Sequence, residues 1–171
     1  MYFFAIIKGL ARGTKMNFKF KKEDIWWGIR LLILVTILAG VFRFGYRVFL
    51  VDGASMDPSI DDKDVILVNK LSYDLQSPDR GDVVAFWHWG FGEFLVKRVV
   101  ALPYEVVEIR EGVIYVNGRE FIDEFNWEGL GFSVNEGPFT LGPQEYWVVG
   151  DNRDVSWWGI IYEDDILGKV K

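Results

Sequence analysis

The sequence has no cysteine and only one histidine. The absence of cysteine excludes disulfide bonds, thiolate zinc sites and cysteine nucleophiles. With one histidine, a histidine-rich metal site is excluded as well, and a Ser-His-Asp triad would have to use His88. We interpret His88, between Trp87 and Trp89, as a strand or membrane-interface residue, because no nearby acid or serine is placed to orient it. The sequence therefore implies no metal and no organic cofactor.

Basic residues are also in the minority, with 19 Lys and Arg against 25 Asp and Glu and a formal net charge of −6. A phosphate backbone requires a basic footprint, so we expect no nucleic-acid partner. Half of the residues are hydrophobic, which is far more than disordered chains carry, so a packed core is expected. A length of 171 residues fits one domain with an appendage.

The N-terminal part of the sequence is first basic and then apolar. Residues 8–22 contain six lysines and arginines and no acid, and residues 31–42 contain no charge. Extended back to Ile25, the apolar run reaches the roughly 20 residues that a bilayer requires. Arg30 lies near one end, where a long side chain can reach the headgroups. We predict an anchor in the lipid bilayer; a buried helix of a soluble domain and a cleaved signal peptide are the alternatives.

The expected organisation has three parts. We predict a basic cytoplasmic segment at 1–24, a transmembrane anchor at 25–46 and an extracytoplasmic β domain at 47–171. The positive-inside rule assigns the basic flank to the cytoplasm, which gives a single-pass protein of the cell membrane. Translation can start at Met1 or at Met16.

Strand-like segments follow the anchor, and no long helical periodicity does. Glycine and asparagine at 110–112 and 117–118 favour tight hairpin turns, because both accept positive φ. The fold class is therefore mostly β, with barrel-like or Greek-key closure. The predicted strands cover residues 47–51, 64–69, 82–89, 93–101, 106–110, 113–116, 146–149 and 166–170.

Two residues are candidates for nucleophilic catalysis. Ser55 follows a strand and a Gly-Ala pair, and Pro58 turns the chain away after it, so its hydroxyl can be exposed at the strand end; an ordinary turn serine is the alternative. Lys97 lies in a strand with apolar residues on both faces. Burial there would lower its pKa, and a neutral amine can take a proton from a serine hydroxyl. An exposed lysine on an edge strand is the alternative.

Several blocks of the sequence, in order, resemble bacterial type I signal peptidases over roughly residues 20–171. The basic N-terminus and the apolar run come first, and the pattern Ser-Met-x-Pro-Thr/Ser is present at Ser55. The remaining blocks are Arg80-Gly81-Asp82-Val83-Val84, Val96-Lys97-Arg98-Val99-Val100, Gly112 to Gly118, Gly150-Asp151-Asn152-Arg153 and Ile166 to Lys169.

The resemblance implies a membrane-bound serine endopeptidase that removes signal peptides from exported preproteins by a Ser-Lys dyad. Ser55 would be the nucleophile and Lys97 the general base, and Ser156 would hydrogen-bond the Lys97 amine. Some relatives carry a hydroxyl at the position of Gly53, where a backbone group or water would serve here. Small residues at the −1 and −3 positions of the substrate would enter a shallow apolar pocket lined by Val51, Met56, Ile60, Leu95 and Val96.

The sequence departs from this family at two places. Relatives continue the last block with Asp-Ser-Arg shortly after the position of Ser156, and this chain continues with Trp157-Trp158-Gly159 instead. Relatives have Gly-Asp where this chain has Tyr104-Glu105. Both changes fall on supporting residues rather than on the dyad.

The aromatic residues exceed what a small core requires, and we hypothesise that several lie at the membrane surface; the set is Phe86, Trp87, Trp89, Phe91, Phe94, Trp157 and Trp158. A non-cleaving relative that acts as an assembly factor for secreted or pilus proteins is an alternative function, although such relatives lose the serine or the lysine. A self-cleaving regulator of the SOS type shares the dyad, but it requires a DNA-binding module and no anchor.

Overall fold

The computed structural model of the protein describes residues 21–122 and 134–171. The predicted basic segment, up to residue 20, and the alternative start at Met16 lie outside the described residues. The chain divides into two units, residues 1–40 and residues 41–171.

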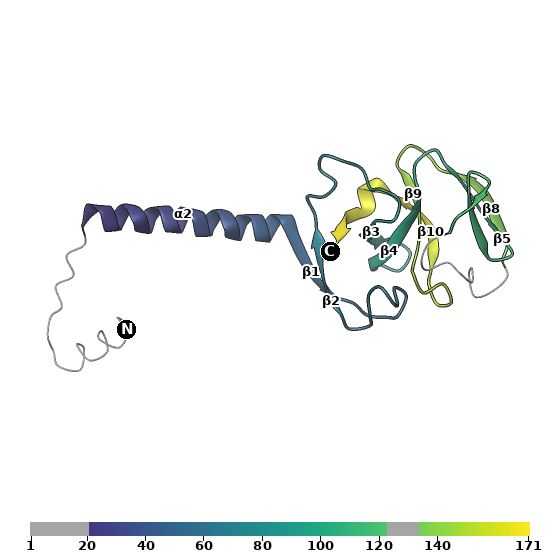
Figure 1. Ribbon diagram of the computed structural model, residues 1–171, viewed down its shortest axis with the longest axis horizontal. Coiled ribbons are helices and arrows are strands. Elements are labelled where there is room, and N and C mark those ends of the chain that lie inside the picture. The colour runs from purple at the N-terminus through teal and green to yellow at the C-terminus, as the bar shows by residue number, and fades with distance from the viewer. Residues whose placement is uncertain (1–20, 123–133) are drawn as a thin grey trace. The chain divides into compact units, whose positions relative to one another are not determined.

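One helix, α2 (Lys22–Gly45), carries the apolar run (Figure 1). It has 24 residues and a mean hydropathy of 2.1, and its leucine and isoleucine side chains are exposed. The Asp24 carboxylate accepts the N–H of Lys21 at the helix start, which satisfies one of the unpaired donors there. In the part of the chain that the structure describes, α2 is the one helix long and apolar enough to cross a membrane.

The remaining elements are β-strands and one short 3-10 helix. They are β1 (Tyr46–Leu50), β2 (Val65–Asn69), β3 (Val83–His88), β4 (Glu93–Ala101), β5 (Val106–Arg110), β6 (Val113–Val116), β7 (Arg119–Glu120), β8 (Glu136–Thr140), β9 (Glu145–Val149), β10 (Trp158–Tyr162), η1 (Glu163–Asp165) and β11 (Ile166–Val170). The mostly-β fold with a single N-terminal apolar helix is confirmed.

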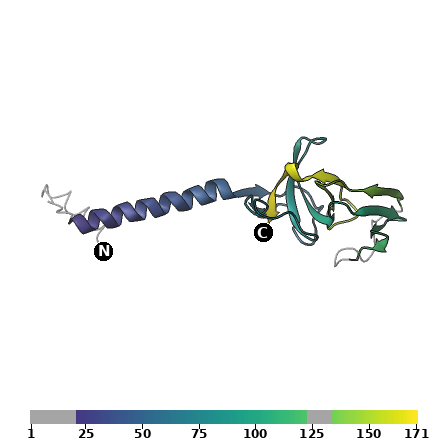
Figure 2. The ribbon, with the colours of Figure 1, turned by 90° about the horizontal axis from the view of Figure 1, so that it is seen from above.

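The strands form two antiparallel sheets. The larger has the order β1-β2-β11-β3-β4-β9-β10, and the smaller has the order β7-β6-β5-β8. Strand β11, yellow in Figures 1 and 2, lies between β2 and β3, with Lys169 opposite Asn69 on one side and opposite Val84 on the other. The sheet is therefore completed by a strand from a distant part of the sequence.

The core alternates along the strands with the period of two that a pleated sheet imposes. On β9, Tyr146 and Val148 join one buried cluster, and Trp147 and Val149 join another, which also contains residues of β5 and β6. A third cluster, formed by Ile66, Val68 and Ala85, is bordered by partly buried side chains of β1 and β4. The strand that carries Lys97 and the strand that precedes Ser55 therefore lie on a packed layer.

Three strands were not predicted from the sequence: β7, β8 and β10. Strand β8 contains Gly137 and Pro138 and is exposed throughout, so it lacks both β-propensity and alternation. Strand β10 begins at Trp158 and contains Gly159, which resembles a turn more than a strand. In both cases the pairing partner supplies the order that the local sequence does not encode.

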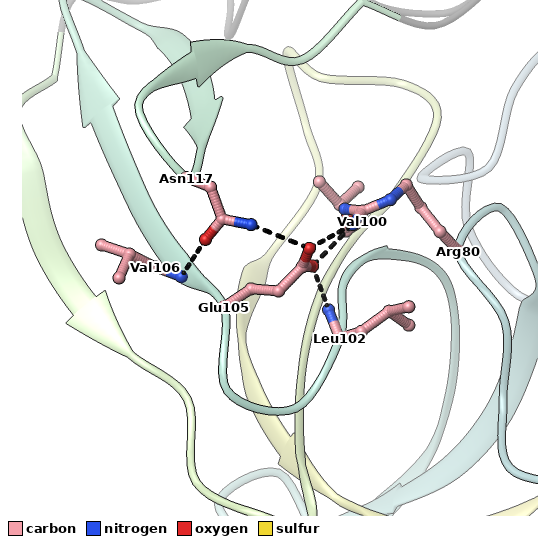
Figure 3. Close-up of polar contacts among 6 residues, drawn as sticks. All are labelled: Arg80, Val100, Leu102, Glu105, Val106 and Asn117. Atoms are coloured by element: carbon pink, nitrogen blue, oxygen red, sulfur yellow. Dashed lines mark hydrogen bonds and ion pairs between the residues drawn. The ribbon is translucent and has the colours of Figure 1, made fainter.

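The Tyr104-Glu105 departure has a structural explanation at Glu105. Its carboxylate accepts two hydrogen bonds from Arg80 at 2.6 Å, one from the N–H of Leu102 at 2.8 Å and one from the Asn117 amide at 3.0 Å (Figure 3). Asn117 in turn accepts the N–H of Val106. Glu105 thus links the segment before β3 to the turn after β6, and it braces the two sheets against each other.

Tyr104 has the left-handed φ of 69° and a side chain that is 73% exposed. A non-glycine residue there is strained by about 1 kcal/mol, and the exposed ring offers little packing in return. We expect Tyr104→Gly to raise the free energy of unfolding by roughly 0.5 kcal/mol, since part of the gain is lost to the greater entropy of the unfolded chain. Denaturant unfolding measures this; Tyr104→Ala, which keeps the Cβ atom, should show no gain, and equal stabilities of the two variants would contradict the explanation.

Candidate active site

Ser55 lies in a turn directly after the first strand. Val51 extends the pairing beyond β1, because its N–H donates to Asp64 and its carbonyl accepts from Lys63. The chain then turns at Gly53, whose φ of 115° is accessible to glycine and whose N–H donates to Asp62 at 2.7 Å. This bond lowers the pKa of Asp62. The turn places Ser55 beside β4, 42 residues further along the chain.

The Lys97 amine contacts the Ser55 hydroxyl. The Nζ–Oγ distance is 2.6 Å, which is short enough for direct proton transfer. Lys97 lies in β4 opposite Val84 of β3, and it is only 3% exposed. The structure therefore brings together the two residues that the sequence singled out, and it excludes the alternative of an exposed edge-strand lysine.

Burial controls the charge of this amine. Desolvation lowers the pKa of Lys97 from 10.5 to about 8, and the nearby Asp151 carboxylate opposes the shift. The net shift of the Lys97 pKa is downward because, among the described residues, no carboxylate is paired directly with the amine. A substantial neutral fraction near pH 8 follows, and a neutral amine is what a general base requires.

Asp151 ties together the segments that carry the dyad. Its carboxylate accepts two hydrogen bonds from Arg98, at 2.7 and 2.6 Å, and one from the Ser59 hydroxyl at 2.6 Å. The Asp151 side chain is fully buried and that of Arg98 is 15% exposed. Because Arg98 follows Lys97 and Ser59 follows Ser55, one buried bidentate ion pair fixes both sides of the site.

Gly150 packs directly beneath Ser55. A Cβ atom at this position would lie 2.1 Å from the Ser55 carbonyl oxygen and 2.3 Å from the Ser156 hydroxyl. The next residue but one, Asn152, donates its N–H to the same carbonyl at 3.2 Å. The segment Gly150–Asn152 thus supports the nucleophile from behind, and only glycine leaves room for the approach.

Ser156 is buried at this point, 5% exposed, but its hydrogen bonds differ from the expectation. Its hydroxyl accepts the N–H of Gly150 at 2.7 Å and donates to the carbonyl of Trp157 at 2.7 Å. No bond to Lys97 is present among the described residues. Ser156 lies beside the site and holds its backbone, while a role in orienting Lys97 stays a prediction.

A groove of about 390 Å³ opens at the dyad and runs along the first part of β4. Four of the five predicted pocket residues line it: Val51, Met56, Leu95 and Val96. Ile60 is not among the residues that line the groove, and it packs against the cluster that contains Ala85. Its role in the substrate pocket stays a prediction.

The groove also contains residues that sequence reasoning missed. They are Phe49, Leu50, Asp52, Ile66, Ala85, Trp87, Glu93 and Phe94. The cross-strand register places Ala85 opposite Val96 and Trp87 opposite Phe94. Alternation along 82–89 and 93–101 could have identified this shared face, had the pairing of the two strands been known.

The aromatic residues divide between core and surface. Phe86 is fully buried, whereas Trp89 is 78% and Phe91 57% exposed. Trp87 and Phe94 lie in the groove. A membrane-surface role for any of them stays a hypothesis. Within the ranges 21–122 and 134–171, no group of three or more His, Asp or Glu side chains could hold a metal ion.

Comparison with known proteins gives consistent results. Residues 25–171 match the family model described as signal peptidase, peptidase S26. A "Signal peptidase IB" from Staphylococcus aureus is 32% identical over an alignment of 171 positions, and the alignment covers 88% of each of the two chains. A "Probable signal peptidase I-2" from Synechocystis is 28% identical over 95% of this chain and 79% of the other. A signal peptidase I structure from Enterococcus faecalis aligns with 56% of this chain and 98% of its own, at 25% identity and a TM-score of 0.48.

Proposed function

The chain belongs to the peptidase S26 family of signal peptidases and is a serine endopeptidase, and from this premise we propose that Ser55 and Lys97 are its catalytic dyad. The observation that carries the proposal is the 2.6 Å contact between the Lys97 amine and the Ser55 hydroxyl. The amine is buried, and its lowered pKa favours the neutral form.

In the proposed reaction, neutral Lys97 accepts the hydroxyl proton as Ser55 Oγ attacks the scissile carbonyl carbon. The protonated amine then gives this proton to the leaving amine, and an ester to Ser55 remains. Neutral Lys97 then takes a proton from a water that attacks the ester carbon, and it returns this proton to Ser55 Oγ as the ester bond breaks and the new carboxyl end leaves. Among the described residues no group accepts the N–H of Ser55, so this donor is free for the oxyanion. Gly53 offers no hydroxyl, and a water or backbone group would be the second donor.

The proposed substrates are signal peptides of exported preproteins, cut after small residues at −1 and −3. The groove supports this, because Val51, Met56, Leu95 and Val96 surround the dyad with apolar surface. The buried Met56, 1% exposed, closes its floor. A shallow apolar site accepts a methyl group and rejects larger side chains by exclusion.

We also propose the orientation given by the basic flank. Residues 1–24 would be cytoplasmic, 25–46 would span the lipid bilayer and 47–171 would be extracytoplasmic. The exposed apolar surface of α2 supports a membrane span. The dyad would then act where preproteins emerge from the membrane.

A non-cleaving assembly factor is the second candidate function. It is favoured by one feature, the absence of Asp-Ser-Arg after Ser156. The contacts of the dyad argue against it, since they persist without those residues.

The test is cleavage of a preprotein with an Ala-x-Ala site by the full-length protein in detergent. We expect a cut after the −1 alanine, mapped by mass spectrometry, and its loss when that alanine is replaced by phenylalanine. Ser55→Ala is the control for contaminating proteases. An inactive wild type on several such preproteins would reject the peptidase function in favour of the assembly factor.

A further inference from the structure

A short chain of hydrogen bonds links Trp157 to the nucleophile. The Trp157 carbonyl accepts from the Ser156 hydroxyl, which accepts from the Gly150 N–H, each at 2.7 Å. Gly150 lies directly against the Ser55 carbonyl. The position of the Trp157 backbone therefore bears on the position of Ser55 through two hydrogen bonds and one close contact.

The Trp157 ring is held by other aromatic rings. Its centroid lies 4.6 Å from that of His88, at an interplanar angle of 79°, and 6.3 and 6.5 Å from those of Phe86 and Phe91. His88 is itself fixed, because it stacks on Phe91 at 4.4 Å and accepts the Phe91 N–H at Nδ1. Edge-to-face contacts of this kind add to the area that the rings bury.

Gly159 leaves room for this arrangement. A Cβ atom at Gly159 would lie 2.7 Å from Cζ2 and 2.9 Å from Cη2 of the Trp157 ring. Gly159 has no positive φ, so its backbone does not require glycine. The missing side chain serves the approach of the ring.

We propose that Trp157 is a positioning residue: the contacts of its ring with Phe86, His88 and Phe91 fix the carbonyl that orients Ser156, and Ser156 holds Gly150 against the nucleophile. This inference rests on the proposed function, because it assigns Trp157 to the same reaction. It gives the sole histidine of the chain a packing role in the site rather than a chemical one.

The location of the ring supports this role over simple core packing. Phe86 and His88 alternate along β3 with Ala85 and Trp87, which line the groove. One strand therefore lines the groove on one face and contacts Trp157 on the other. The ring is only partly buried and packs against the edge of its core cluster, so its removal leaves the largest part of that cluster intact.

The test measures kcat, KM and pH dependence of the full-length protein in detergent on an Ala-x-Ala peptide. We expect Trp157→Ala to lower kcat about 100-fold, as a displacement of about 1 Å can, with KM nearly unchanged. The acidic limb of the pH profile of this variant should move to higher pH, because water that enters a loosened site reduces the desolvation that lowers the pKa of Lys97. Gly159→Ala keeps the indole ring but displaces it, so kcat should also fall. Trp157→Phe and His88→Phe each keep an aromatic ring at the same place, so both variants should retain most of the wild-type activity.

Trp89→Ala is the matched control, since Trp89 lies on the same hairpin and contacts Trp87 and Asp165 instead; it should keep the wild-type kcat and pH profile. Wild-type kcat in folded Trp157→Ala would overturn the proposal. So would a loss that follows the folded fraction, measured by circular dichroism, with the acidic limb unmoved. An inactive wild type would overturn the proposed function and this inference together, whereas an active wild type with an indifferent Trp157 rejects only the inference.

Discussion

Replacement of Lys97 by methionine is expected to lower kcat on the order of 10⁴-fold or more, because the reaction loses its general base. Methionine has nearly the same length and keeps the apolar contacts of the buried stem, so the fold should survive. Lys171→Met is the control, since Lys171 is exposed and does not line the groove. Retained cleavage by folded Lys97→Met would remove Lys97 from the dyad.

The wild-type pH profile tests the same assignment independently. The pKa of Lys97 is lowered to about 8 by burial, and the neutral form is the active one. Cleavage should therefore rise as the pH increases through about 8 and level off above it. A rise centred below pH 6 would instead indicate a carboxylate base, and it would contradict the role of Lys97 even if the methionine variant were inactive.

Replacement of Gly150 by alanine is expected to lower kcat by roughly 100-fold or more, as a displaced nucleophile does. The added methyl group would lie 2.1 Å from the Ser55 carbonyl oxygen and 2.3 Å from the Ser156 hydroxyl. Since the shortest clash is with the backbone of the nucleophile itself, relaxation is costly and displaces Ser55.

Gly142→Ala is the matched control for that variant. Its Cβ would lie 3.3 Å from the Glu145 carboxylate, which has to shift by only a few tenths of an ångström and is no part of the site, so activity should stay close to wild type. Wild-type kcat in Gly150→Ala would show that the segment Gly150–Asn152 does not support the nucleophile. Binding of a peptide substrate, measured by fluorescence, separates a displaced Ser55 from a collapsed groove.

The sequence predicted the parts of the fold that local pattern encodes. The alternation and β-branched residues of 93–101 and 106–110 gave strands close to the observed bounds. Strand β8 was missed because Gly137 and Pro138 oppose strand formation locally. Its order comes from pairing with β5, which no local window contains.

The site was predictable to the same extent. Ser55 and Lys97 were found through short motifs, and their contact depends on a register that sequence alone does not give. The contact of Arg98 with Asp151, 53 residues away, leaves no periodic or compositional signal. The prediction that Ser156 would bond Lys97 was carried over from relatives, whereas the contacts of its hydroxyl with the Gly150 N–H and the Trp157 carbonyl have no signal in the sequence.

The position of β11 has a consequence for the order in which the protein is made. Strands β1 and β4, which carry the two halves of the site, leave the ribosome well before residues 166–170, yet β11 is the strand that joins β2 to β3. Until it arrives, Ser55 and Lys97 belong to two separate pieces of sheet with unpaired edges. We therefore expect the proposed dyad to assemble only once residues 166–170 are inserted into the sheet.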